Sequence, residues 1–246
     1  MDEVAYQQYR RESENWLKAA RGDLLARMVG KATGGRKDLE ILDMGAGVGQ
    51  NIPVLLQFGV VDVLEINEIG LQALRAIDGI REIFDQPVPF ALDRRYDVII
   101  ATDVLEHIED DKGAARWVAE HLKPGGVFFS TVPAYQFLFS EHDVALHHFR
   151  RYTAGNYAAI MEPQMKVERC GYFNSILFPI AAAARLFSRL RSKARNSGPA
   201  QKQSSVVPGP VDRFFRLLLS LEIKMIEKRV GLPFGLSVYC LARRHN

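Results

Sequence analysis

The strongest constraint on the fold is a glycine-rich turn that follows a short apolar run. Residues 41–51 read ILDMGAGVGQN, which has the form of a buried strand, a tight turn and the start of a helix. Gly45 and Gly47 let the backbone approach a ligand closely, because glycine has no Cβ atom. The N-terminus of the following helix attracts an anionic group. This segment therefore predicts a ligand-binding unit of strand, turn and helix.

An acidic residue downstream of the turn indicates the kind of ligand. The glycines are spaced G-x-G-x-G, and Gln50 stands where the dinucleotide-binding pattern G-x-G-x-x-G has its third glycine. This spacing counts against a nicotinamide dinucleotide. The next apolar run contains Glu65, about 20 residues after the turn, where a carboxylate can accept hydrogen bonds from both hydroxyls of a ribose. We expect Glu65 to bind the sugar of a nucleoside ligand.

The rest of the chain alternates short apolar runs with stretches of helical periodicity. The apolar runs that predict strands lie at 39–44, 61–66, 80–84, 96–101, 127–132, 165–178 and 236–242. Apolar residues at helical spacing predict an amphipathic leading helix at 12–29 and a later helix at 211–230. This alternation favours an α/β fold with a parallel sheet and crossover helices.

The length and the order of these elements fit one domain of 246 residues. Its expected parts are an N-terminal helical cap at 1–38, a cofactor-binding core at 39–170, a helical insertion at 171–235 and a last strand at 236–246. Within the insertion, the small, polar and proline residues at 196–210 predict a flexible linker.

Composition narrows the classes of partner and compartment. The formal net charge of +3 is too small to indicate a polyanionic partner. Cys170 and Cys240 lie far apart without metal-ligand spacing, so we expect no disulfide framework, no metal site and a reducing compartment. Residues 1–11 lack the apolar segment of a secretory signal, and the uncharged apolar stretch at 170–184 is shorter than the roughly 20 residues that cross a bilayer. The expected location is the cytoplasm.

Four motifs in the correct order resemble those of the class I S-adenosylmethionine-dependent methyltransferases. Asp43 with the turn at 45–49 is similar to their first motif, and Glu65 to the acid of their second strand. Residues 96–108 (YDVIIATDVLEHI) are similar to the fourth-strand motif, and 122–126 (LKPGG) to the turn before the fifth strand. The resemblance implies a Rossmann-like fold with a mostly parallel seven-stranded sheet and helices on both faces. It also implies S-adenosylmethionine as cofactor and S-adenosylhomocysteine as product.

The same resemblance implies a cofactor-binding role for residues in these motifs. Those implied are Asp43, Gly45, Ala46, Gly47 and Gly49 around the methionyl group, Glu65 and Ile66 at the ribose, Asp85 at the adenine amino group, and Asp103, Val104 and Leu105 beneath the sulfonium. Asp85 has an alternative interpretation as a turn aspartate before Pro87. Glu106 and His107 are interpreted as residues that steady a loop, without a catalytic role.

A second polar cluster follows the predicted fifth strand, where ligands bind in open α/β sheets. Residues 140–152 read SEHDVALHHFRRY and hold three of the six histidines, which favours a functional cluster. The pattern Ser-x-His-Asp, four residues, then His-x-Arg-Arg-Tyr resembles a bacterial methyltransferase subgroup often associated with glycosyltransferases of cell-surface glycan and lipid-carrier pathways. His147 stands where that pattern has a small residue.

Acceptor chemistry is assigned to this cluster. His142 or His148 is the candidate general base, and Asp143 the residue that orients an imidazole. The residues expected to bind the acceptor are Arg150, Arg151 and Tyr152, the two arginines as a clamp for a phosphate or carboxylate. The alternative is a structural network of ion pairs among Asp143, Arg150 and Arg151.

The expected reaction is methyl transfer to an oxygen, with nitrogen as the alternative, of a small metabolite or one linked to a lipid or glycan. Basic and aromatic residues at 173–195 allow peripheral contact with the inner membrane surface, although a helical hairpin over the site or a dimer seam is the preferred interpretation. The basic run at 185–195 raises an RNA methyltransferase as a rival, but no RNA-binding motif accompanies it. A non-catalytic cofactor-binding subunit is the other rival.

Overall fold

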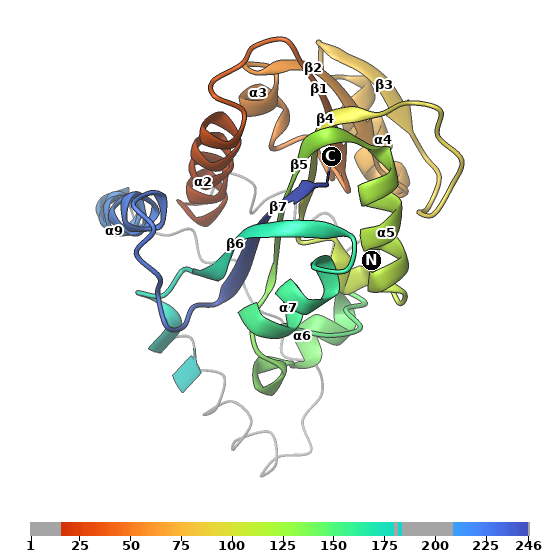
Figure 1. The fold of residues 1–246 in the computed structure, drawn as a ribbon. Coiled ribbons are helices and arrows are strands. Elements are labelled where there is room, and N and C mark those ends of the chain that lie inside the picture. Colours follow the sequence, from red (N-terminus) through yellow and green to blue (C-terminus); the bar gives the residue numbers. More distant parts are fainter. Residues whose placement is uncertain (1–15, 180–181, 184–208, 246) are drawn as a thin grey trace.

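A computed structural model describes residues 16–179, 182–183 and 209–245, which form a seven-stranded sheet covered by helices (Figure 1). The strands are β1 (Leu39–Met44), β2 (Gly59–Leu64), β3 (Ile80–Phe84), β4 (Tyr96–Thr102), β5 (Leu122–Pro133), β6 (Met165–Phe173) and β7 (Ser237–Arg244). Their order across the sheet is β3-β2-β1-β4-β5-β7-β6. The first five strands pair in parallel, and β7 runs antiparallel between β5 and β6. The predicted mostly parallel, Rossmann-like sheet is confirmed.

Helices follow most of the strands. They are α2 (Trp16–Ala32), α3 (Ile52–Leu55), α4 (Glu68–Arg75), α5 (Asp111–His121), α6 (Glu141–Ala145), α7 (Ala154–Met161) and α9 (Gly209–Glu227), with short 3-10 helices η2 (Leu105–His107) and η3 (Gln136–Leu138). Three of them begin at residues whose side chains accept a hydrogen bond from the first turn, namely Asn67, Asp110 and Thr153. Such capping satisfies backbone N–H groups that have no partner within the helix.

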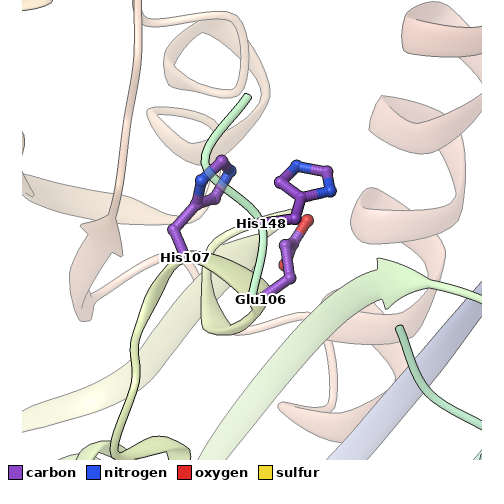
Figure 2. Close-up of side chains that lie close together, drawn as sticks. All are labelled: Glu106, His107 and His148. Atoms are coloured by element: carbon purple, nitrogen blue, oxygen red, sulfur yellow. The ribbon is translucent and has the colours of Figure 1, made fainter. Parts of the chain in front are cut away.

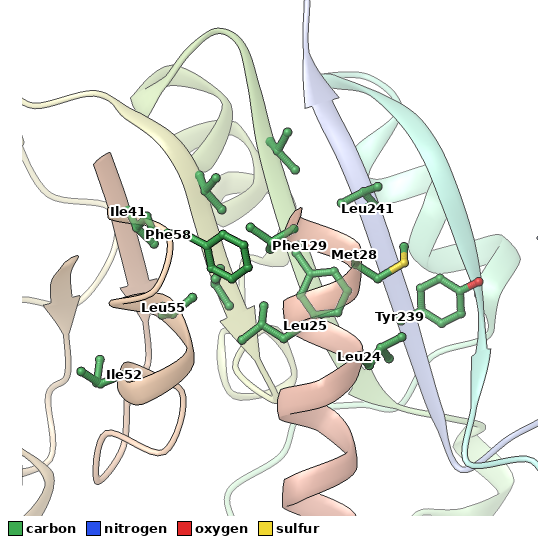
Figure 3. Close-up of a cluster of buried hydrophobic side chains, with 14 of the residues drawn as sticks. Leu24, Leu25, Met28, Ile41, Ile52, Leu55, Phe58, Phe129, Tyr239 and Leu241 are labelled. Carbon is green, nitrogen blue, oxygen red and sulfur yellow. The ribbon is translucent and has the colours of Figure 1, made fainter. Parts of the chain in front are cut away.

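The alternation of side chains along the strands divides the core into two layers. In β4, Val98 and Ile100 belong to one buried cluster, and Ile99 and Ala101 to the other. The first cluster lies under α2, α3 and α9, and Figure 3 shows residues of α2 packed against the sheet. The second lies under α5 and α7. Because both faces are covered, the central strands read as continuous apolar runs.

Two strands end earlier than the sequence predicts, and in each case a carboxylate accepts hydrogen bonds from the backbone just after the strand. β2 ends at Leu64 rather than 66, because the Glu65 carboxylate accepts hydrogen bonds from the next two backbone N–H groups and turns the chain. β6 ends at Phe173 rather than 178. There Asn174 adopts a φ of 63°, and the N–H of Ser175 donates to the carboxylate of Glu222.

The segment predicted as a helical insertion, 171–235, contains α9, which packs on α2. Leu219, Ile223 and Ile226 of α9 join the same buried cluster as Leu24 and Leu25 of α2. The opposite face of α9 exposes a stripe of apolar side chains: Phe214, Leu217, Leu221 and Met225. The predicted linker at 196–210 lies outside the described residues except for its last two, which begin α9, and the basic run at 185–195 lies outside them entirely. Among the described helices, none is long and apolar enough to cross a membrane.

Candidate active site

A cavity of about 910 Å³ opens beside the carboxyl ends of the parallel strands. Its walls come from distant parts of the chain: Leu17 and Arg21 of α2, the turn after β1, residues 64–67 after β2, residues 102–109 after β4 (Leu105 excepted), and residues between 142 and 151. This is the edge at which the sequence predicts the cofactor and acceptor residues. The structure therefore brings part of each predicted cluster to one cavity.

The glycine turn takes a backbone conformation that favours glycine. Gly45, Gly47 and Gly49 have φ angles of 70°, 59° and 82°. A Cβ atom on Gly45 would lie 2.5 Å from a methyl carbon of Val104, closer than van der Waals contact permits. Gly45 and Gly47 line the cavity. Gly49 and the buried Ala46 belong to the same turn but are not among the lining residues.

Glu65 joins the glycine turn to the end of β2. One carboxylate oxygen, Oε2, accepts from the N–H of Gly47 at 2.7 Å, and Oε1 accepts from the N–H groups of Ile66 and Asn67 at 2.9 and 2.8 Å. A carboxylate has about four acceptor positions, so one remains on Oε2. Glu65 is buried but lines the cavity, as does the exposed Ile66. Glu65 can therefore accept a hydrogen bond from one ribose hydroxyl while it keeps its three bonds to backbone N–H groups. To accept from both ribose hydroxyls, it would have to give up one of those three bonds.

Asp43 lies fully buried behind the turn and is not one of the residues that line the cavity. The side-chain N–H₂ of Asn51 lies 3.4 Å from both of its carboxylate oxygens and also donates to Thr102 at 3.1 Å. The pKa of Asp43 is raised to about 7, mainly by burial and also by the negative charge of Glu65, while the contact with Asn51 opposes the rise. The carboxylate therefore destabilises the protein when it ionises in the absence of ligand.

Asp43→Asn is expected to make the ligand-free protein more stable than the wild type at pH 8. The folded pKa of about 7 lies above the ordinary value of 3.8, so stability from Asp43 is present below about pH 4 and is lost as pH rises through 7. Three pKa units correspond to at most about 4 kcal/mol. Urea unfolding at pH 5 and pH 8 measures the difference, with the exposed Asp23→Asn as control. Identical pH dependence in Asp43→Asn and wild type would contradict this account.

The residues after β4 divide between the cavity and the core. Asp103 adopts a φ of 56°, forms an ion pair with Arg21 of α2 at 2.5 Å and accepts from the hydroxyl of Thr131 at 3.2 Å. Val104 lines the cavity, whereas Leu105 is buried in the core and is not among the lining residues. The sequence gives no sign that Arg21 belongs to the site, because only the folded chain brings α2 to this loop.

Asp85, the predicted partner of the adenine amino group, is exposed and is not among the residues that line the cavity. It follows β3, and the nearby Pro87 and Val88 line the cavity instead. Its contact with adenine stays a prediction that this geometry does not support.

Asp143 is the centre of a buried polar network after β5. Its carboxylate accepts from the N–H and hydroxyl of Ser140 at 2.8 and 3.1 Å, contacts Nδ1 of His148 at 3.0 Å and pairs with Arg151 at 2.7 Å. Burial alone would raise the pKa of Asp143, but the bond with His148 and the charge of Arg151 outweigh it and hold the pKa below its usual range. This carboxylate therefore contacts the imidazole of one of the two candidate bases, His148. His148 and Arg151 both line the cavity, as does the exposed His142 on α6.

Arg150 and Tyr152 contact Asp111 and do not line the cavity. Arg150 pairs with Asp111 at 2.7 Å and donates to the carbonyl of Glu109. The hydroxyl of the buried Tyr152 also donates to Asp111, at 2.9 Å. Neither residue is among those that line the cavity. Acceptor binding by Arg150 and Tyr152 stays a prediction without support here, and of the two arginines only Arg151 pairs with Asp143 as the structural alternative supposes.

Glu106 and His107, which had no assigned chemistry, line the cavity together with His148 (Figure 2). The rings of His107 and His148 meet edge to face, with centroids 4.5 Å apart. Burial and the neighbouring His148 together lower the pKa of His107 to about 4. Burial and the charge of Asp103 raise the pKa of Glu106 well above its usual range. The signal in the sequence was their position directly after β4, at the ligand-binding edge of the sheet.

Comparisons with known proteins agree with this architecture. A family described as a methyltransferase domain matches residues 7–190. A structure described as a sarcosine dimethylglycine methyltransferase from Galdieria sulphuraria is 17% identical, with 93% of this chain and 86% of that chain covered and a TM-score of 0.60. The N-methyltransferase NodS from Bradyrhizobium japonicum, solved with S-adenosylhomocysteine, is 14% identical, with 98% and 99% covered and a TM-score of 0.57. The [4+2]-cyclase SpnF is also 14% identical, with 93% and 82% covered and a TM-score of 0.54. At these identities the structures show a shared fold, and the cyclase shows that other chemistry uses it.

Proposed function

Since the chain belongs to the methyltransferase domain family and has the class I fold, we propose that it methylates a hydroxyl oxygen of a small metabolite or of one carried on a lipid or glycan. The enzyme is an S-adenosylmethionine-dependent methyltransferase, and S-adenosylhomocysteine is its product. The single observation that carries the proposal is the cavity in which the glycine turn and Glu65 face the same space as Glu106, His107 and His148.

The cofactor end of this cavity fits the sugar and methionyl parts of the nucleoside. Gly45 and Gly47 present backbone without side chains, and Glu65 keeps one acceptor position for a ribose hydroxyl. Ligand pockets usually measure roughly 300–1,000 Å³, and this one lies at the upper end of that range, which leaves room for an acceptor beside the cofactor. When bound, the cofactor supplies a methyl group on a sulfonium leaving group.

The acceptor end holds residues that can activate a hydroxyl. When the Nδ1–H of His148 is the donor in its hydrogen bond with Asp143, the other ring nitrogen, Nε2, carries a lone pair. That lone pair can accept from an acceptor hydroxyl or bind a cation. His142 lines the same cavity and is the second residue proposed to take the proton. Positioning of the acceptor can lower the barrier by roughly 7 to 11 kcal/mol, more than a placed base contributes.

Nitrogen is the alternative acceptor atom. The structurally similar NodS is named as an N-methyltransferase. The lowered pKa of His107 favours an uncharged imidazole, which can accept a hydrogen bond from an amine N–H. A lipid-linked acceptor is supported by the exposed stripe of α9 at Phe214, Leu217 and Leu221, which the basic residues Arg213 and Lys224 flank.

The test combines binding with transfer. Calorimetry with S-adenosylhomocysteine should show one site per chain, and a labelled methyl donor should label at least one member of a panel of hydroxylated metabolites, amines and lipid-linked sugars. Flotation with anionic vesicles measures whether the protein binds a membrane surface, as a lipid-linked acceptor would require. No binding of the nucleoside contradicts the proposal, and binding without transfer to any acceptor favours a non-catalytic subunit.

A further inference from the structure

We propose that Glu106, His107 and His148 bind a divalent first-row metal cation, which takes the acceptor oxygen as a further ligand. One atom from each of the three side chains can be chosen so that all lie within 4.8 Å of one another. Figure 2 shows the three side chains converging from η2 and from the segment after α6. The inference rests on the proposed function for the acceptor, while the cation site itself rests on these three residues.

The clearest sign is the carboxylate of Glu106. It is completely buried, and neither of its oxygens has a hydrogen-bond partner in the part of the chain that the structure describes. Buried polar groups nearly always have partners, so an exception calls for an explanation such as a bound ion. A cation between Glu106 and the two imidazoles would supply both oxygens with a partner.

The arginines near Glu106 are paired with other carboxylates. Arg21 is paired with Asp103, and Arg151 with Asp143. Each of these two guanidinium groups is therefore already paired, and the described residues offer Glu106 no cation of its own when its carboxylate ionises. Because a buried charge is costly without compensation, a divalent cation would be attracted to this position.

Both histidines are held as metal-binding histidines usually are. His148 is bonded through Nδ1 to the Asp143 carboxylate at 3.0 Å, which leaves Nε2 as the ligand nitrogen. The ring of His107 has a backbone hydrogen bond with Leu146. Outer partners of this kind fix the tautomer and direct the second nitrogen to a metal. Ligands about 2.1 Å from a cation lie roughly 3 to 3.5 Å apart, so closing the site needs only small side-chain movements.

The ligand set indicates the class of metal and its role. Two imidazoles and one carboxylate suit zinc, iron or a similar cation better than magnesium or calcium, which prefer oxygen. Three protein ligands leave coordination positions open, as in catalytic rather than structural sites. A hydroxyl bound there would lose its proton more readily, because a bound cation lowers the pKa of its oxygen ligands. The chemistry points to acceptors that present a hydroxyl to the metal.

The experiment titrates full-length protein, stripped with a chelator and dialysed, with ZnCl₂ in a calorimeter. We expect one site per chain in the wild type. Glu106→Gln and His148→Ala should each weaken zinc binding by about 100-fold or more, because even an outer-shell substitution costs 10- to 100-fold. His142→Ala is the matched control: it removes an imidazole from the same cavity and should bind zinc as the wild type does. Binding of S-adenosylhomocysteine shows that each variant is folded.

The outcomes separate this inference from the proposed function. Absence of zinc binding by wild-type protein that binds S-adenosylhomocysteine would overturn the site, as would unchanged binding in Glu106→Gln and His148→Ala. Methyl transfer at full rate after complete chelation would overturn the role of the metal while leaving the methyltransferase intact. Transfer that falls on chelation and returns with zinc would support it. Failure to bind S-adenosylhomocysteine at all would count against the proposed function instead.

Discussion

Glu65→Ala is expected to weaken binding of S-adenosylhomocysteine by about 100-fold or more. The wild-type carboxylate accepts from three backbone N–H groups, of Gly47, Ile66 and Asn67, and keeps one acceptor position for the ribose. A hydrogen bond to a charged group contributes about 1.5 to 3 kcal/mol. The substitution removes that bond and also the tie between the glycine turn and β2, so the cavity wall loses its fixed shape. Isothermal titration calorimetry measures the effect.

Two variants control this experiment. Glu68→Ala removes an exposed glutamate three residues away, whose partner is Arg75 on the surface of α4, and should bind S-adenosylhomocysteine as the wild type does. Glu65→Gln keeps the size of the side chain but sets an amide N–H₂ against a backbone N–H donor, and should bind weakly. Circular dichroism melting separates lost binding from lost folding. Affinity within twofold of wild type in folded Glu65→Ala would remove Glu65 from the cofactor site.

The parts of the fold that the sequence predicts best are those decided by neighbours along the chain. The bounds of β1 and β3 agree with the prediction, because an apolar run between polar or glycine-rich turns is a local signal. The glycine turn is equally local, since its three positive φ angles suit glycine. The early end of β6 was beyond local reasoning, because Glu222 on α9 lies 47 residues from the Ser175 N–H that it accepts from.

In the candidate site, too, local features could be predicted from the sequence and contacts between distant residues could not. Which residues gather after β4 and β5 could be predicted, because both strands end at the ligand-binding edge of the sheet. Their pairing could not: Arg150 pairs with Asp111, and Arg151 with Asp143, although the two arginines are adjacent. Successive residues in extended chain point in opposite directions, and only the fold decides which direction leads to the cavity. Cysteine spacing likewise gave no sign of a site built from histidine and glutamate.

Asp143→Ala is expected to lower the free energy of unfolding by about 3 to 5 kcal/mol. The substitution leaves Arg151, which is 7% exposed, as a buried charge without its carboxylate partner, and it frees Ser140 and His148. Breaking one partner of a buried ion pair has this cost because the remaining charge is uncompensated. For a chain of this size the melting temperature should fall by roughly 10 °C. Urea unfolding and thermal melting both measure it.

The double variant Asp143→Ala with Arg151→Met identifies the cause. Methionine fills the space of the arginine stem without its charge, so the double variant should be more stable than Asp143→Ala alone. His148 would still lack the carboxylate that holds its ring, and zinc binding should remain about 10- to 100-fold weaker in both variants. Recovered stability without recovered zinc binding would assign Asp143 two separable functions, one structural and one at the acceptor site. A double variant no more stable than the single one would show that the network is held by Ser140 and the helix cap rather than by charge.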